Sequence, residues 1–223
     1  MDKLAAFAIS AQDRRQSASS VVADALREAI FRGVLKRGTP LRQDAIAKQF
    51  AVSQVTVREA FRLLGEEGVV DIVPRKGTVV SSLSAEDIEE IVELRITLET
   101  LLIARAIPRL TYEDFAAAEA IVSQLEAALT LEDQLALNLD FHRRLYEKAE
   151  RPRTLAVLDK LRLALEPYLR LLWTKSTYKA NSQADHLELL ALCKTQQVGA
   201  AIEVLKRHIS KTAEEIGMLL RAE

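Results

Sequence analysis

The chain has 223 residues, of which 49% are hydrophobic and 28% charged, a composition typical of a globular protein. It contains no apolar run near the roughly 20 residues that a membrane-spanning helix needs, and its first residues lack the pattern of a signal peptide. The single cysteine, Cys193, excludes an internal disulfide and fits a reducing compartment. We therefore expect a cytoplasmic protein with no membrane association.

Charge is distributed unevenly along the chain, although the formal net charge is only −1. Residues 1–80 contain 13 Lys and Arg against nine Asp and Glu, whereas the remainder contains 18 against 23. The basic N-terminal part and the acidic remainder indicate that only the N-terminal part of the chain binds a polyanion. With seven Gly and five Pro in the whole chain, helix is favoured over sheet.

The first predicted helix runs from Ser19 to Gly33, because Val22, Leu26 and Ile30 repeat at helical spacing. The segment that follows it, VLKRGTPL, is predicted to be a turn.

Two further short helices and a β-hairpin are expected next. The helices are predicted over 43–50 and 54–67, and Ser53 is a good N-cap for the second of them. After Gly68, two short β-branched runs are separated by residues 74–77, which predicts a hairpin. Three helices followed by a hairpin make a winged helix-turn-helix, whose third helix enters the major groove of DNA.

Several polar and basic side chains lie on the outward face of the third helix and at the hairpin tip. Arg suits guanine and phosphate, Gln suits adenine, and a glycine lets the backbone approach DNA closely. The alternative is an ordinary solvated helix face. The candidate DNA contacts are Arg42, Ser53, Gln54, Thr56, Arg58, Arg62, Arg75, Lys76 and Gly77.

From Val21 to Ser81 the sequence resembles the GntR family of bacterial regulators, most specifically in the pattern VSxxxVREAxRxLxxEG, here Val52 to Gly68. The resemblance implies a DNA-binding transcription factor in which Ser53, Gln54, Thr56, Arg58 and the wing residues touch operator DNA. Gln54 and Thr56 replace the Arg and Pro that are usual in this family, which affects the expected operator sequence and not the fold.

From Ser84 the sequence changes to long amphipathic helices without sustained heptads, which favours an all-α antiparallel bundle. Pro167 falls inside one of them and is expected to kink it. The helices are predicted over 85–107, 111–129, 131–149, 152–175, 180–196 and 198–221. The expected organisation is therefore mainly α, with a flexible arm over 1–18, a winged helix-turn-helix domain over 19–82 and a helical effector-binding and dimerisation domain over 84–221.

All three histidines of the chain, His142, His186 and His208, lie on different helices of the predicted bundle. Asn138 shares the helix face of His142, four residues away. If the helices bring them together, three imidazoles and an amide oxygen suit Zn, Ni or another divalent ion. Spacing alone leaves the alternative that these histidines are structural or surface groups.

The second half resembles the FadR C-terminal ligand-binding (FCD) domain, in the segments ELRITLE, NLDFHRRLYEKA, DHLELLAL and KRHI. This resemblance implies a metal site made of Asn138, His142, His186 and His208, with Asn in place of the commoner Asp. It also implies that Arg95 binds the carboxylate of a small organic-acid effector. The alternative for Arg95 is an interhelical ion pair with a Glu. Cys193 is expected to be a buried structural thiol, and Trp173 and Tyr178 either line a pocket or pack.

The function predicted from these features is a DNA-binding transcriptional regulator, repressing more often than activating in this family, that acts as a homodimer and responds to a carboxylate. A metalloenzyme is disfavoured because no HExxH-like motif supplies a general base beside the histidines. A structural DNA-binding protein without an effector is disfavoured because dimerisation alone needs far less than a large helical domain.

Overall fold

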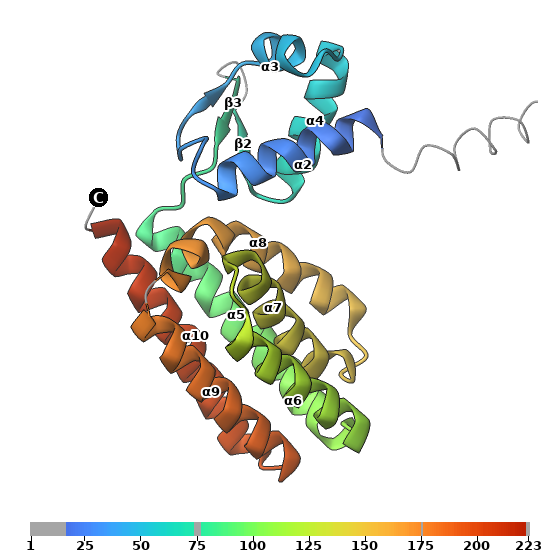
Figure 1. The fold of residues 1–223 in the computed structure, drawn as a ribbon, viewed down its shortest axis with the longest axis vertical. Coiled ribbons are helices and arrows are strands. Elements are labelled where there is room, and N and C mark those ends of the chain that lie inside the picture. Colours follow the sequence, from blue (N-terminus) through green and yellow to red (C-terminus); the bar gives the residue numbers. More distant parts are fainter. Residues whose placement is uncertain (1–16, 74–76, 175, 222–223) are drawn as a thin grey trace, which may run out of the picture. The chain divides into compact units, whose positions relative to one another are not determined.

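The computed structural model describes residues 17–73, 77–174 and 176–221 (Figure 1). Contacts within the chain divide it into two compact units, Met1–Ser82 and Leu83–Glu223, and each is described by itself. The first unit combines short helices with a small antiparallel sheet, and the described residues of the second form helices and their connections, without a strand. The predicted fold class, a winged helix-turn-helix followed by an all-α bundle, is confirmed.

The described part of the first unit has three helices, which are α2 (Ala18–Phe31), α3 (Gln43–Phe50) and α4 (Gln54–Glu66). Ser17 caps α2 by accepting the N–H of Ser20, so this helix begins one residue before the predicted start. The predicted arm otherwise lies outside the described residues. The apolar faces of the three helices form the core, which contains Val22, Leu26, Ile30, Ile46, Ala47, Val57, Ala60, Phe61 and Leu64.

The sheet of this unit has the strand order β1-β3-β2. Strands β2 (Val70–Val73) and β3 (Gly77–Val80) are the two sides of the predicted hairpin, whose tip at 74–76 lies outside the described residues. The strand β1 (Pro40–Leu41) replaces part of the predicted turn. Pro40 pairs with Val79, a partner far along the chain, so no local pattern indicates this strand.

The second unit is a bundle of long helices joined by short connections. α5 begins at a capping box between Ser84 and Asp87, and α6 begins at a second one between Thr111 and Asp114. The elements are α5 (Ala85–Ala106), the 3-10 turn η1 (Ile107–Arg109), α6 (Tyr112–Ala127), α7 (Leu131–Glu147), α8 (Pro152–Trp173), α9 (Ser176–Lys194) and α10 (Val198–Arg221). Among the described residues, no helix is both long enough and apolar enough to cross a membrane.

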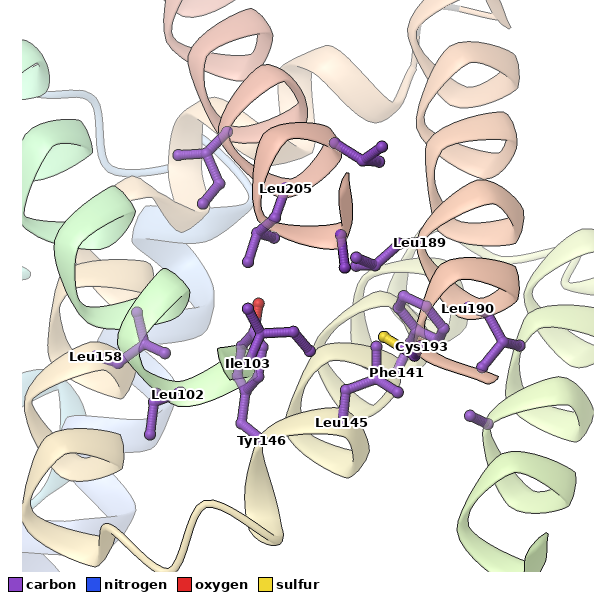
Figure 2. Close-up of a cluster of buried hydrophobic side chains, with 14 of the residues drawn as sticks. Leu102, Ile103, Phe141, Leu145, Tyr146, Leu158, Leu189, Leu190, Cys193 and Leu205 are labelled. Atoms are coloured by element: carbon purple, nitrogen blue, oxygen red, sulfur yellow. The ribbon is translucent and has the colours of Figure 1, made fainter. Parts of the chain in front are cut away.

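The bundle core is built around α5, which packs against α7, α8 and α10. Leu102 and Ile103 of α5 meet Phe141 and Leu145 of α7 and Leu205 of α10 in one buried cluster (Figure 2). All five side chains are fully buried. This packing holds the faces of α7 and α10 that carry histidines at fixed positions relative to α5.

The start of α9 differs from the prediction. The helix begins at Ser176, whereas the polar sequence STYKANSQAD predicted a connection until about residue 180. The inward positions of this first part include Tyr178 and Ser182, which are buried although they are polar. A helix whose buried face carries hydroxyl groups lacks the apolar periodicity on which the prediction depended.

Candidate functional site

The N-terminus of α4 presents the predicted DNA-reading end. The hydroxyl of Ser53 accepts the N–H of Thr56 at 3.1 Å and lies 2.8 Å from the Thr56 hydroxyl. Ser53 is therefore the N-cap that the sequence predicts, and its own side chain remains exposed. The remaining N–H groups of the first turn suit a phosphate oxygen.

Gln54 and Arg58, one turn apart on α4, are both exposed and share a face. The backbone carbonyl of Gln54 accepts a hydrogen bond from Gln43 Nε2 at 2.5 Å, which fixes the start of α4 against α3. Val55 beside them is 65% exposed. The sequence did not indicate it as a candidate DNA contact, because an apolar residue carries no charge that would attract DNA. Such a side chain suits the methyl group of thymine.

The remaining predicted DNA contacts differ in their surroundings. Arg62 is exposed but paired with the carboxylates of Glu59, at 2.6 Å, and Glu66. Arg42 is exposed at the start of α3, and Gly77 is exposed at the start of β3 with φ of 95°, a conformation that favours glycine. The predicted wing residues Arg75 and Lys76 lie outside the described residues.

The three histidines of the bundle converge, one each from α7, α9 and α10. The ring centroids of His142, His186 and His208 lie 5.1 to 5.4 Å apart, and one nitrogen from each ring lies within 4.8 Å of the others. Two nitrogens bound to one ion are at most about 4 Å apart, since each lies about 2.1 Å from it. Small side-chain rotations are therefore enough for all three to bind one ion.

Two buried groups at this cluster have no protein partner. Neither ring nitrogen of His186 makes a hydrogen bond, although His186 is only 1% exposed. The Oδ1 atom of Asn138, one turn before His142, is also buried without a partner. Buried polar atoms are rarely left unsatisfied, because the loss of water costs about 1–3 kcal/mol for each. These atoms therefore fit a metal ion better than a purely structural role.

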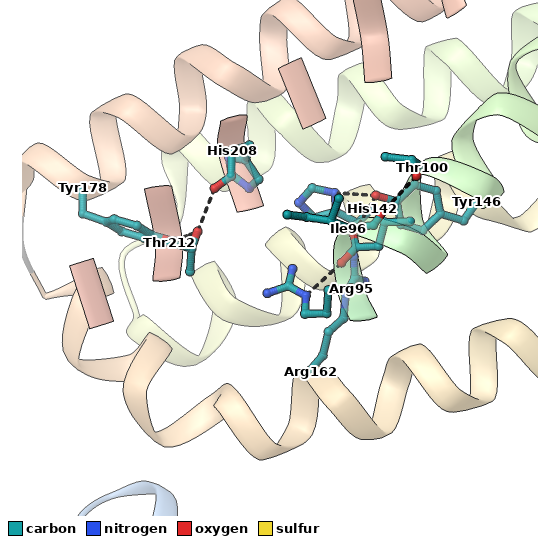
Figure 3. Close-up of polar contacts among 10 residues, drawn as sticks. Arg95, Ile96, Thr100, His142, Tyr146, Arg162, Tyr178, His208 and Thr212 are labelled. Carbon is teal, nitrogen blue, oxygen red and sulfur yellow. Dashed lines mark hydrogen bonds and ion pairs between the residues drawn. The ribbon is translucent and has the colours of Figure 1, made fainter. Parts of the chain in front are cut away.

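The other two histidines are oriented by neighbouring groups that the sequence analysis did not single out. His208 Nδ1 lies 3.3 Å from a carboxylate oxygen of Asp185 on α9. His142 Nδ1 lies 3.5 Å from the hydroxyl of Tyr146, as Figure 3 shows. A hydrogen bond at Nδ1 leaves Nε2 as the free lone pair, which is how metal-binding histidines are commonly held. Asp185 directly precedes His186 in the sequence, and this position was the signal that could have identified Asp185 as part of the site.

Burial lowers the pKa of both His142 and His186 well below the ordinary value for histidine. The charge of Arg162 adds to this effect at His142, and the neighbouring His208 adds to it at His186. Both rings are therefore neutral at pH 7, the state in which imidazole binds a metal ion.

Arg95 lies beside the cluster in a buried ionic network (Figure 3). Its Nε donates to Glu99 at 2.8 Å within α5, and Arg162 of α8 donates to the other oxygen of Glu99 at 2.6 Å. The hydroxyl of Tyr146 also donates to Glu99, at 2.8 Å. Burial alone would raise the pKa of Glu99, but the charges of Arg162 and Arg95 outweigh it and lower the pKa to about 2. The interhelical ion pair considered for Arg95 is thus made by Arg162, while Arg95 pairs within its own helix.

A small pocket opens beside His208 between α9 and α10. Tyr178, Ser182 and Thr212 line it together with Asn181, Asp185 and Lys211. Tyr178 therefore lines a pocket, and it also packs edge-on against Trp173, with ring centroids 6.2 Å apart. Cys193 is fully buried in the core, which agrees with a structural thiol.

Comparison with known proteins identifies both halves of the chain. Residues 18–80 match the family described as bacterial regulatory proteins, gntR family, and residues 90–211 match the FCD domain. The solved structure of Escherichia coli McbR/YncC superposes with a TM-score of 0.74 at 21% identity, over 92% of this chain and 99% of that one. A GntR family regulator from Pseudomonas syringae is 32% identical, with a TM-score of 0.55 over 92% and 86%.

Curated relatives are also regulators. The uncharacterized HTH-type regulator YdhC of Bacillus subtilis is 35% identical over 52% of this chain, and the repressor RspR of Escherichia coli is 23% identical over 86% of this chain and 85% of its own. Three relatives, YdhC among them, are matched over 54%, 44% and 35% of their own lengths, so the chain spans about half of them or less. The chain belongs to the GntR family of bacterial regulatory proteins, with an FCD domain as its second half, and this family and these relatives are transcriptional regulators rather than enzymes.

Proposed function

We propose that this regulator is a repressor whose affinity for operator DNA is controlled by a small organic acid, bound in the helical domain beside a divalent metal ion. The observation that carries the proposal is the convergence of His142, His186 and His208. The ring nitrogens of His186 and the Oδ1 atom of Asn138 are buried there without a hydrogen-bond partner. Relatives named as repressors, such as RspR, support the direction of regulation.

His142, His186 and His208 would hold the metal ion through neutral nitrogens, and Asn138 would add an amide oxygen. Zn and Ni both accept such a ligand set. When bound, the ion supplies positive charge and coordination positions that a carboxylate oxygen can take. Arg95, buried in the network with Glu99, adds a guanidinium, a group that binds carboxylates well.

Control of DNA binding requires that the acid favour one arrangement of the regulator over another. A coupling of this kind is typically about 1–3 kcal/mol, or about 5- to 150-fold in operator affinity. Because the metal would join α7, α9 and α10, a ligand at the metal can change how these helices pack.

Elemental analysis of protein purified without chelator or metal-affinity resin tests the metal site. We expect about one divalent ion per chain in the wild type and none in His186→Ala. Asn138→Asp is the matched variant with the opposite effect: its added negative charge should tighten metal binding. A metal-free wild type whose thermal stability is unchanged by added Zn, Ni or Mn would overturn this part of the proposal.

Effector control is tested by gel shifts on the promoter region upstream of the gene, with and without a panel of carboxylic acids. An active acid should change operator affinity of the wild type, and His186→Ala should lose that response while still binding DNA. If no acid alters operator binding, the proposed control is wrong.

A further inference from the structure

The buried ionic network around Glu99 ends at one of the three clustered histidines. Glu99 of α5 accepts hydrogen bonds from Arg95 on the same helix and from Arg162 on α8. The hydroxyl of Tyr146 on α7 donates to it as well, at 2.8 Å. Tyr146 lies one turn after His142, and its hydroxyl is 3.5 Å from His142 Nδ1 (Figure 3). A continuous chain of polar contacts therefore connects two arginines to the imidazole of His142.

Stability alone does not account for such a network. Glu99, Arg95 and Arg162 are all buried, so each has lost the hydration of its charge. Replacing a buried ion pair by apolar side chains of the same volume is often neutral or even stabilising. A buried network of this kind is better explained by a side chain that it holds in one orientation, and here that side chain is His142.

The direction of the hydrogen bonds follows from the charge of Glu99. Its carboxylate accepts from three donors, so it is ionised and has no proton to give. The Tyr146 hydroxyl has a single proton, and that proton lies between its oxygen and the carboxylate oxygen of Glu99. Towards His142 the Tyr146 oxygen can therefore only accept, so Nδ1 of His142 carries the proton. A neutral imidazole protonated on Nδ1 has its lone pair on Nε2.

Tyr146 is held firmly in this position. Its side chain is fully buried, so no bulk water competes for the hydroxyl. The guanidinium carbon of Arg162 lies 5.5 Å from the centroid of the Tyr146 ring, within the range of a cation–π contact. Arg162 therefore contacts both the carboxylate that accepts the proton of the hydroxyl and the ring that carries the hydroxyl.

His208 has a simpler version of the same arrangement. Its Nδ1 lies 3.3 Å from a carboxylate oxygen of Asp185, with no residue between them. A carboxylate thus stands behind two of the three imidazoles, directly at His208 and through Tyr146 at His142. Histidines that bind metal ions almost always donate their other ring N–H to such a partner.

We propose that Glu99 and Tyr146 are positioning residues of the metal site, which keep the proton of His142 on Nδ1 and so present Nε2 to the ion. This proposal rests on the proposed metal site and specifies how one of its ligands is prepared. The negative charge of Glu99 would act through Tyr146 to make His142 a stronger electron-pair donor.

Zinc binding by the full chain tests the proposal. The protein is freed of metal by dialysis against a chelator, and its affinity for Zn²⁺ is measured by competition with a chromophoric chelator. Tyr146→Phe keeps the ring and the ion pairs of Glu99 but removes the hydroxyl, so we expect the affinity for Zn²⁺ to fall by about 10- to 100-fold. Tyr168→Phe is the matched control and should leave the affinity unchanged. Tyr168 is also buried, but its hydroxyl accepts the N–H of Leu83, about four helical turns before Glu99.

The position of the proton is a second measurement, which a role in packing alone would not move. Because the chain has three histidines, labelling with ¹⁵N-histidine gives three ring systems, and His142→Gln identifies the signals of His142 by their absence. Long-range ¹H–¹⁵N spectra distinguish protonated, unprotonated and metal-bound ring nitrogens. In the wild type we expect His142 to be protonated on Nδ1 without metal and to bind Zn²⁺ through Nε2. Metal-free Tyr146→Phe should instead show both tautomers.

Several results would overturn the proposal. Binding of Zn²⁺ through Nδ1 of His142 in the wild type would place the proton on the opposite nitrogen, and this result is decisive even if Tyr146→Phe fails to fold. An unchanged tautomer or an unchanged affinity in Tyr146→Phe would reduce Tyr146 to a packing residue. These outcomes leave the metal site standing, whereas a wild type that binds neither Zn²⁺ nor Ni²⁺ would overturn the metal site and this inference together.

Discussion

Arg58 is the residue of the reading helix whose contribution can be tested most directly. It is exposed, it shares a face with Gln54, and it is not part of the ion pairs that hold Arg62. A bidentate contact from Arg to guanine is worth about 1–3 kcal/mol, so Arg58→Ala should weaken operator binding by about 5- to 150-fold. Fluorescence anisotropy with operator and unrelated DNA measures both affinity and selectivity. Unchanged values would show that another face reads the DNA.

Glu99 is the residue on which the buried ionic network depends. Removing its charge leaves Arg95 and Arg162 buried together without a counter-charge, so Glu99→Gln should cost about 3–5 kcal/mol of unfolding free energy. Because the pKa of Glu99 is lowered to about 2, its contribution is complete above the pKa of the unfolded chain and is lost as the pH falls toward 2.

Urea unfolding followed by the fluorescence of Trp173, the single tryptophan, reports the bundle alone. Glu203→Gln is the control for this measurement, since Glu203 pairs with Lys206 on the exposed side of α10. We expect it to change the unfolding midpoint little. A Glu99→Gln variant as stable as this control would contradict the importance of the network.

At the scale of an element, α4 needs its N-cap for stability and its free N–H groups for DNA. Ser53→Asp keeps an N-cap of comparable strength, yet places a negative charge where a phosphate is expected. The variant should therefore retain protection of the α4 amides against hydrogen exchange while losing DNA binding. Ser53→Ala, which removes the cap, should instead lower the stability of α4 by about 1 kcal/mol. If Ser53→Asp binds DNA normally, this helix end does not face a phosphate.

Elements were predictable from the sequence to the extent that their signals are local. The cap at Ser53 and the apolar spacing of α4 are contained in consecutive residues, and both are confirmed. β1 and the start of α9 were missed because one depends on pairing with Val79 and the other buries Tyr178 and Ser182 in place of aliphatic side chains.

The candidate site was predictable only in part for the same reason. Spacing places Asn138 and His142 on one face of α7, but the convergence of His186 and His208 with them depends on how three helices pack. The sequence alone left that question open, and the family resemblance suggested the answer. Tyr146 and Glu99, which meet across helices, had no signal in the local sequence.

At the scale of the whole molecule, we expect a homodimer on DNA. The chain has one helix-turn-helix, whose reading helix covers only a few base pairs, and a two-fold dimer gains affinity by binding two half-sites at once. Light scattering at micromolar concentration should give about twice the 24.9 kDa mass of the chain. A monomer in solution that also fails to dimerise on operator DNA would contradict this expectation.

Because Cys193 is buried, the reactivity of its thiol reports how often the second half of the chain opens. The thiol is fully buried, and burial raises its pKa to about 12, so at neutral pH it is neither accessible nor ionised. Alkylating reagents should therefore modify native protein only when the bundle transiently unfolds around α9, and the labelling rate measures how often this occurs. Added metal or acid that binds the folded bundle should slow labelling, and fast modification insensitive to both would show that α9 opens independently of the site.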